Sequence, residues 1–173
     1  MPFYLPLSGP AGFLSLGTGR GAAVKFAPGI AVTNAHNANL IAPGAVIGQS
    51  SRYDLLFFRV GLSESSPPMA QPQKGEAVIA YGQGRQSEMR QAEGVVTEPA
   101  VSIPAECAGC GTQQAFIFAA DGGKGFSGGP VVDAFSGKLV GVVFAFKDDA
   151  GGRLMYAYDM AHVVDQYERV KTP

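Results

Sequence analysis

The sequence lacks an excess of charge of either sign. Its 173 residues include 13 basic and 14 acidic side chains, which gives a formal net charge of -1. No cluster of Lys and Arg stands out from this balance, so nothing in the chain marks a surface for nucleic acid or for an anionic membrane. Internal repeats and low-complexity tracts are also missing. These absences exclude nucleic-acid binding and electrostatic membrane binding from the functions that the sequence predicts.

Long apolar runs are missing too. No stretch approaches the roughly eighteen apolar residues that a membrane-spanning helix needs. Residues 1–16 are fairly apolar, but the first basic residue of the chain is Arg20 and the apolar run is interrupted, so this segment is a poor signal peptide. If Met1 is the native start, we expect a cytoplasmic protein; if a leader has been removed, we expect a periplasmic or secreted one. The sequence leaves both alternatives open.

Cysteine and histidine occur only twice each. Cys107 and Cys110 stand in the tetrapeptide Cys-Ala-Gly-Cys, which would suit a redox pair or half of a zinc site. Zinc normally takes four ligands, and both histidines lie far from this pair in the sequence. We therefore expect a loop that holds a local disulfide or two free thiols, and we predict no metal and no other cofactor.

Glycine and proline, by contrast, are abundant, with 24 and 12 residues. They separate short apolar runs, which is typical of an all-β sandwich or barrel. Hydrophobic residues make up 46% of the chain, enough to bury a core. About ten strands are predicted, over residues 21–27, 30–34, 45–49, 55–60, 77–81, 89–97, 115–119, 131–132, 139–146 and 154–158.

Two further segments have a different character. The run 63–74 holds three prolines, three serines and a glutamate without apolar periodicity, so we expect a linker over 63–75 between an N-terminal half, 1–62, and a C-terminal half, 76–173. Together the halves would form one domain. Near the end, Asp159 is a good helix N-cap, and apolar residues from Met160 onward recur at helical spacing. This helix is expected to pack on the outside of the second β-unit.

The strongest chemical signal lies at residues 125–130, which read Gly-Phe-Ser-Gly-Gly-Pro. A serine hydroxyl becomes a useful nucleophile only when a base removes its proton, and attack on an amide creates an oxyanion that needs preplaced donors. Glycines on both sides of Ser127 would let backbone N–H groups face a substrate. The alternative is an ordinary glycine-rich turn with a surface serine.

A candidate base and its partner occur upstream. Residues 31–36 read Ala-Val-Thr-Asn-Ala-His, so His36 follows a β-branched strand that provides a rigid mount. Residues 52–60 read Arg-Tyr-Asp-Leu-Leu-Phe-Phe-Arg-Val, and Asp54 stands at the head of this very apolar strand. A partly buried aspartate must be paired, and an imidazole N–H is a suitable partner. Taken singly, the histidine could be structural and the aspartate a turn cap.

Together, the three motifs resemble the trypsin/chymotrypsin family of serine proteases over roughly residues 17–170. That family places histidine after a Thr-Ala-Ala-like strand end, aspartate in Asp-Leu/Ile-Ala-Leu, and serine in Gly-Asp-Ser-Gly-Gly-Pro. The resemblance implies two six-stranded antiparallel β-barrels of chymotrypsin type with a C-terminal α-helix. It implies a His36–Asp54–Ser127 triad, an oxyanion hole formed by the N–H groups of Gly125 and Ser127, and a protein or peptide substrate. The oligomeric state is not predicted.

Three departures from the family pattern affect these expectations. Phe126 replaces the aspartate that pairs with a newly cut N-terminus in secreted zymogens, so no such activation step is expected. His36 and Asp54 are only 18 positions apart, which predicts a stripped-down first barrel. Phe144 stands near the position of a serine that supports the catalytic aspartate in the family, so that support is absent or replaced.

Substrate preference is suggested by Asp121, six residues before Ser127. In trypsin-like members an aspartate at that spacing lies at the base of the primary specificity pocket and pairs with Lys or Arg, although Asp121 also fits a simple turn. Phe146 and Leu154 fall near positions where the family keeps glycine, and large side chains there would shorten the pocket. His162 is interpreted as a partly exposed residue of the C-terminal helix.

Two rival interpretations remain. Residues 125–129 also satisfy the Gly-x-Ser-x-Gly elbow of α/β-hydrolases, with Asp148 or Asp149 and then His162 completing a triad. However, the chain after Ser127 is short and lacks the alternation of strands and helices which that fold requires. The second rival is a catalytically inactive, protease-like binding module with a misaligned triad.

Overall fold

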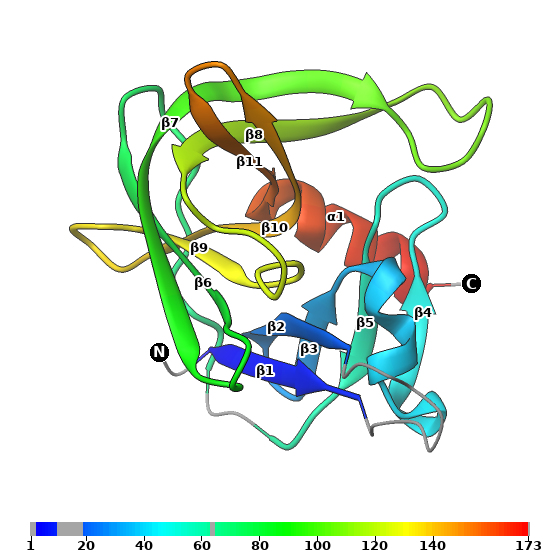
Figure 1. Ribbon diagram of the computed structural model, residues 1–173. Coiled ribbons are helices and arrows are strands. Elements are labelled where there is room, and N and C mark those ends of the chain that lie inside the picture. Colours follow the sequence, from blue (N-terminus) through cyan, green and yellow to red (C-terminus); the bar gives the residue numbers. More distant parts are fainter. Residues whose placement is uncertain (1–2, 10–18, 63–64, 173) are drawn as a thin grey trace.

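The protein is described here from a computed structural model, which covers residues 3–9, 19–62 and 65–172. It consists of two antiparallel sheets and a C-terminal helix (Figure 1). The first sheet has the strand order β1-β2-β3-β5-β4. Its strands are β1 (Tyr4–Ser8), β2 (Arg20–Ala27), β3 (Ile30–Thr33), β4 (Val46–Gln49) and β5 (Leu56–Arg59).

The second sheet is a closed barrel with the order β10-β11-β8-β7-β6-β9, because β9 pairs with both β6 and β10. Its strands are β6 (Ala77–Gln83), β7 (Met89–Pro104), β8 (Thr112–Ala120), β9 (Pro130–Asp133), β10 (Leu139–Asp149) and β11 (Gly152–Asp159). The helix α1 (Met160–Lys171) follows β11 directly, and Asp159 caps it by accepting a hydrogen bond from the His162 backbone N–H. The predicted all-β class, the ten predicted strands and the capped helix are confirmed.

Three details differ from the sequence-based expectations. Among the described residues the first sheet has five strands and is open, whereas two six-stranded barrels were expected. Strand β1 was not predicted, and it exists because Tyr4–Ser8 pairs along β2. Strand β7 runs seven residues beyond the predicted end at Thr97, because register shifts around Glu98 interrupt the alternation of apolar residues without ending the pairing with β8.

Of the three clusters of hydrophobic core among the described residues, two explain how the parts hold together. One fills the barrel and contains Phe116, Phe118 and Phe126. The other lies between the first sheet, the outer face of the barrel and α1. Tyr167 of α1 packs edge-on against Phe26 of the first sheet, with ring centroids 5.5 Å apart. The helix therefore covers both sheets, and the expectation that it packs on the second unit alone was too narrow.

The predicted linker is only partly described, since positions 63 and 64 lie outside the described residues. Within residues 65–75 the backbone forms a single parallel bridge, between Met69 and Leu139 of the barrel. Most of the segment 1–16, interpreted as a poor signal peptide, also lies outside the described residues. Among the helices that the structure describes, none has the length and apolar character needed to cross a membrane.

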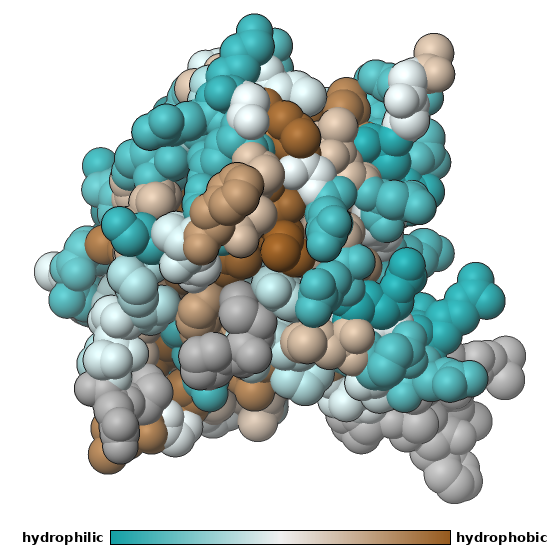
Figure 2. Space-filling model, turned by 90° about the vertical axis from the view of Figure 1, so that its left-hand side faces the viewer, coloured by the Kyte–Doolittle hydropathy of each residue, from teal (hydrophilic) through white to brown (hydrophobic). Residues whose placement is uncertain are grey.

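On the side of the barrel that carries β6, β7 and β9, the surface is mostly hydrophilic around a small apolar area (Figure 2). A pocket on this side is lined mostly by apolar residues, among them Ile79, Val95 and Ala134, and by one carboxylate, Glu93. None of the site residues expected from the sequence lines it. The candidate site lies on another part of the surface.

Candidate active site

His36 and Asp54 come together because the two strands that precede and follow them are neighbours. The short 3-10 helix η1 (Ala35–Leu40) begins just after β3 and carries His36, while Asp54 stands two residues before β5. Strands β3 and β5 pair with Thr33 opposite Leu56. His36, which follows β3, and Asp54, which precedes β5, therefore lie at the same end of this strand pair. Asp54 Oδ2 lies 2.6 Å from His36 Nδ1, and Asp54 Oδ1 accepts the His36 backbone N–H at 3.1 Å.

The surroundings of this pair favour a particular tautomer of the imidazole. The side chain of Asp54 is 13% exposed and that of His36 is 48% exposed. The hydrogen bond to Asp54 raises the pKa of His36; burial opposes this effect, and the charges of Asp54 and Glu106 add to it. A neutral imidazole that donates from Nδ1 to the carboxylate leaves Nε2 as an acceptor, which is the form a general base requires.

The backbone of Asp54 is held in place by a buried tyrosine that was not predicted from the sequence. The Asp54 backbone N–H donates to the Tyr158 hydroxyl at 2.9 Å, and that hydroxyl donates to Gln113 Oε1 at 2.7 Å. Burial raises the pKa of Tyr158, so the hydroxyl keeps its proton. The Tyr158 ring stacks on Phe144 with centroids 4.0 Å apart. Phe144 stands near the position at which the family has a serine that supports the aspartate. Here Phe144 instead supports Asp54 indirectly, because it holds the Tyr158 ring in place.

The serine loop, residues 125–130, requires glycine at two positions for geometric reasons. Gly125 and Gly128 have φ values of +93° and +86°, which side chains rarely adopt. A Cβ atom at Gly125 would collide with the carbonyl oxygen of Gln83, and one at Gly128 would collide with that of Ala22. The loop can therefore lie against β6 and β2 only where no side chain intervenes.

Within residues 125–130, two backbone N–H groups have no hydrogen-bond acceptor among the described residues. The carbonyl of Ser127 accepts the Ala22 backbone N–H at 3.0 Å, and the carbonyl of Gly125 accepts that of Gln83 at 2.8 Å. The N–H groups of Gly125 and Ser127 have no acceptor among the residues that the structure describes. Two unpaired backbone donors on one tight loop are what an oxyanion hole needs.

Two buried amide side chains, neither of which was predicted from the sequence, join the sheets at this loop. Asn37 Nδ2 donates to the Ser127 carbonyl at 3.1 Å and to the Thr33 hydroxyl at 3.1 Å. Gln83 Nε2 donates to the carbonyls of Leu7 and Gly21, each at 2.9 Å. Gln83 could have been identified from the sequence, because it continues an apolar strand. A polar side chain that such a strand buries must form hydrogen bonds.

His36 and Ser127 line one pocket of about 310 Å³, together with Asn37, Lys124 and Gly125 among others. No hydrogen bond joins the Ser127 hydroxyl to the imidazole in the described part of the chain. Catalytic hydrogen bonds are often long before substrate binds. The structure thus brings the three predicted side chains close together. The hydrogen bond between His36 and Asp54 is formed, and Ser127 lines the same pocket as His36.

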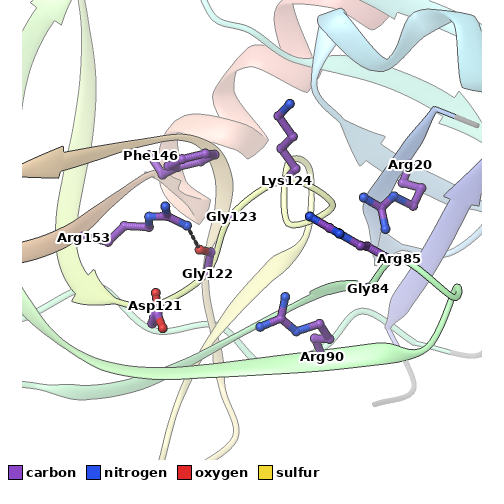
Figure 3. A pocket seen from close by; sticks show the side chains of 10 residues that line it. All are labelled: Arg20, Gly84, Arg85, Arg90, Asp121, Gly122, Gly123, Lys124, Phe146 and Arg153. Atoms are coloured by element: carbon purple, nitrogen blue, oxygen red, sulfur yellow. Dashed lines mark hydrogen bonds between the residues drawn. The ribbon is translucent and has the colours of Figure 1, made fainter. Parts of the chain in front are cut away.

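The remaining sequence-based candidates lie elsewhere. Asp121 and Phe146 line a neighbouring pocket, of which Leu154 is not part (Figure 3). His162 Nδ1 bonds Asp159 Oδ1 at 2.8 Å at the start of α1. Asp148, the rival acid, pairs with Arg153. Since the named strands of both sheets pair only in antiparallel fashion, the α/β-hydrolase interpretation is wrong.

The cysteine pair forms a disulfide, Cys107–Cys110, in the turn between β7 and β8. This outcome is one of the two structural alternatives that the sequence allowed. Among the described residues no group of three or more His, Cys, Asp or Glu side chains is arranged to hold a metal ion.

The fold and this arrangement of side chains define a protein of the trypsin-like protease class. The chain belongs to the trypsin-like peptidase family, because the family's model, the trypsin-like peptidase domain, matches residues 21–142. A search of curated proteins finds no significant match.

Several solved structures share the fold. The active form of the Rv3671c protease from M. tuberculosis matches with a TM-score of 0.76 and 19% identity, over 98% of this chain and 81% of that one. The HtrA-type protease AlgW, solved with a tripeptide, matches with a TM-score of 0.76 and 19% identity, over 99% and 60%. The MamO protease domain from Magnetospirillum magneticum matches with a TM-score of 0.66 and 17% identity, over 95% of each chain. At these identities the likeness establishes the fold alone.

Proposed function

We propose that the chain is a serine endopeptidase with Ser127 as nucleophile, His36 as general base and Asp54 as the residue that orients the imidazole. The observation that carries this proposal is the 2.6 Å contact between His36 Nδ1 and Asp54 Oδ2, made by an imidazole that lines the same pocket as Ser127. Membership of the trypsin-like peptidase family supports it independently. The tripeptide bound to the similar protease AlgW supports a peptide or protein substrate.

The proposed mechanism follows from these roles. The Ser127 hydroxyl attacks the scissile carbonyl while His36 Nε2 takes its proton, and the N–H groups of Gly125 and Ser127 stabilise the oxyanion. His36 then returns the proton to the leaving amine, and Asp54 stabilises the imidazolium in between. Water hydrolyses the resulting acyl-enzyme by the same route. Since the histidine and aspartate come from the half 1–62 and the serine from the half 76–173, the two halves act as one peptidase domain.

The same proposal accounts for Phe126. Its side chain is fully buried in the core of the barrel, where it anchors the serine loop. An apolar anchor needs no new N-terminus as an ionic partner. We therefore propose that the protein is active without a zymogen-type cleavage.

Covalent labelling by a fluorophosphonate tests the function. The probe is expected to modify Ser127 in the wild-type chain, as located by mass spectrometry, and to leave Ser127→Ala and His36→Ala unlabelled. Ser136→Ala, in the exposed turn between β9 and β10, is the matched control and keeps full labelling. A wild-type protein that stays unlabelled would favour the alternative function, an inactive protease-like binding module.

Asp54→Asn is expected to lower the pKa of His36 and to reduce turnover by about 10⁴-fold. The hydrogen bond to Asp54 is the largest cause of the raised pKa in the wild type, so its loss shifts the acid limb of the activity profile to lower pH. NMR titration of the imidazole measures this pKa, and with two histidines in the chain, His162→Gln identifies the signal. An unchanged pKa would contradict the pairing.

The same shift has a consequence for stability. Because the pKa of His36 is raised in the folded protein, protonation of the imidazole favours folding. This contribution is complete below the ordinary histidine pKa and is lost as pH rises through the folded-state pKa.

A further inference from the structure

A second pocket, of about 390 Å³, lies beside the one that contains Ser127. Its lining is dominated by positive charge from segments that are far apart in the sequence (Figure 3). One lining side chain is a carboxylate, Asp121, and five are cations, Arg20, Arg85, Arg90, Lys124 and Arg153. A pocket with this lining is built for an anion, since cations around a concave surface concentrate positive potential.

The two pockets adjoin each other. Arg20 and Lys124 line both of them. The wall of the second pocket also includes Gly122 and Gly123, which lie between the end of β8 and the serine loop. A peptide whose scissile carbonyl lies at the Ser127 hydroxyl can therefore place one side chain in the second pocket. This is the side chain of the residue on the amino side of the scissile bond, which passes Lys124 on its way.

Most of the positive charge in this pocket is not neutralised by the protein. Arg153 is paired with Asp148 at 2.7 Å, and its guanidinium lies over the ring of Phe146 at 4.4 Å. The other four cations form no ion pair with a carboxylate of the described residues. Unpaired guanidinium groups provide the planar donors that bind carboxylates with two parallel hydrogen bonds.

Asp121 does not reverse this balance. The pKa of Arg153 is raised, first by its hydrogen bond to Asp148 and in smaller part by the charge of Asp121. Asp121 therefore already lies in the field of a cation of the protein. A lysine or arginine side chain of a substrate would enter among five like charges, which disfavours the basic preference that Asp121 suggested from the sequence.

We propose that this pocket is the primary specificity pocket of the enzyme and that it selects an acidic side chain, Glu or Asp, on the amino side of the scissile bond. This specificity rests on the serine-endopeptidase function proposed above. The substrate carboxylate binds the guanidinium groups of Arg85 and Arg90, while the scissile carbonyl stays at the Ser127 hydroxyl.

Three peptides that differ only in the residue before the cut, Glu, Gln or Lys, test the preference. The full chain is expected to cleave the Glu peptide with a kcat/KM about 10- to 100-fold above that of the isosteric Gln peptide, as charge-assisted hydrogen bonds imply. The Lys peptide is expected to be the poorest. This comparison needs no variant and so does not depend on any substitution being tolerated.

Variants then assign the effect to the pocket. The double variant Arg85→Gln/Arg90→Gln is expected to reduce the Glu-over-Gln ratio by about tenfold. Lys138→Gln removes one positive charge from a residue that lines neither pocket, and it is expected to leave the ratio unchanged. An equal fall of the ratio in both variants would overturn the assignment.

Fluorophosphonate labelling of the same samples separates the two proposals. If Ser127 is labelled and the Glu and Gln peptides are cleaved equally, or Lys is preferred, the acidic specificity is wrong and the peptidase function stands. If the wild type is neither labelled nor active on any of the peptides, both proposals fall.

Discussion

Ser127→Ala is expected to reduce the turnover of a cleaved peptide by on the order of 10⁶-fold, with little effect on the KM. Ser127 lies between Phe126 and Gly128 on a loop that β2, β6 and β10 hold by backbone hydrogen bonds, so the substitution removes one hydroxyl from an otherwise intact site. The residual rate would come from the oxyanion donors and from substrate binding, which alanine leaves in place.

His36→Ala is expected to cause a loss of similar size, and the double variant no more than either single one. The hydroxyl and the imidazole act as a unit, so removing the second member after the first costs nothing further. Single-turnover kinetics with the preferred peptide measure these losses, and Ser136→Ala again provides the control. Losses that add in the double variant would show that the two residues work separately, contrary to the proposed mechanism.

Phe126→Ala is expected to lower the free energy of unfolding by about 3–5 kcal/mol. The Phe126 side chain is 0% exposed and packs in the barrel core, close enough to β6 that a Cβ atom on Gly82 would overlap its ring. Alanine would leave a cavity under the serine loop that the surrounding strands fill only in part. A loss of this size is a large share of the 5–15 kcal/mol that stabilises a typical domain.

Urea unfolding followed by far-UV circular dichroism measures this loss. Phe135→Ala is the matched control, because Phe135 is 91% exposed in the turn between β9 and β10 and its removal is expected to change stability by less than about 0.5 kcal/mol. Equal midpoints for the two variants would mean that Phe126 does not anchor the loop.

The strands were predictable where apolar runs are bounded by turn residues. The β2–β3 hairpin is an example, since Pro28 and Gly29 separate two apolar runs and Gly29 adopts a positive φ of +73°. Strand β1 was not predicted because it has only five residues and one of them is proline. Such a segment forms a strand only when it can pair with the edge of a neighbouring strand, here β2. The C-terminal part of β7 was not predicted because register shifts interrupt the alternation of apolar and polar residues there.

The residues proposed to be catalytic could be identified in advance because the motifs that carry them are local in the sequence. Glycines 125 and 128 are required by their own backbone angles and by close approach, so the serine loop is written in six consecutive residues. Tyr158, which holds Asp54, was not predictable, because nothing near it in the sequence indicates that its hydroxyl reaches a residue more than a hundred positions away.

The sequence by itself thus determined the β class, the turns, the capped helix and the three side chains proposed for catalysis, since each depends on a few neighbouring residues. Only the tertiary structure decided which groups meet: the pairing of β3 with β5 joins His36 to Asp54, and the docking of the serine loop on β2 places Ser127 in the same pocket. The charge of the neighbouring pocket was decided in the same way. Asp121 alone suggested a negative pocket, but cations from distant segments converge around it, because electrostatic potential sums over distance in space and not along the chain.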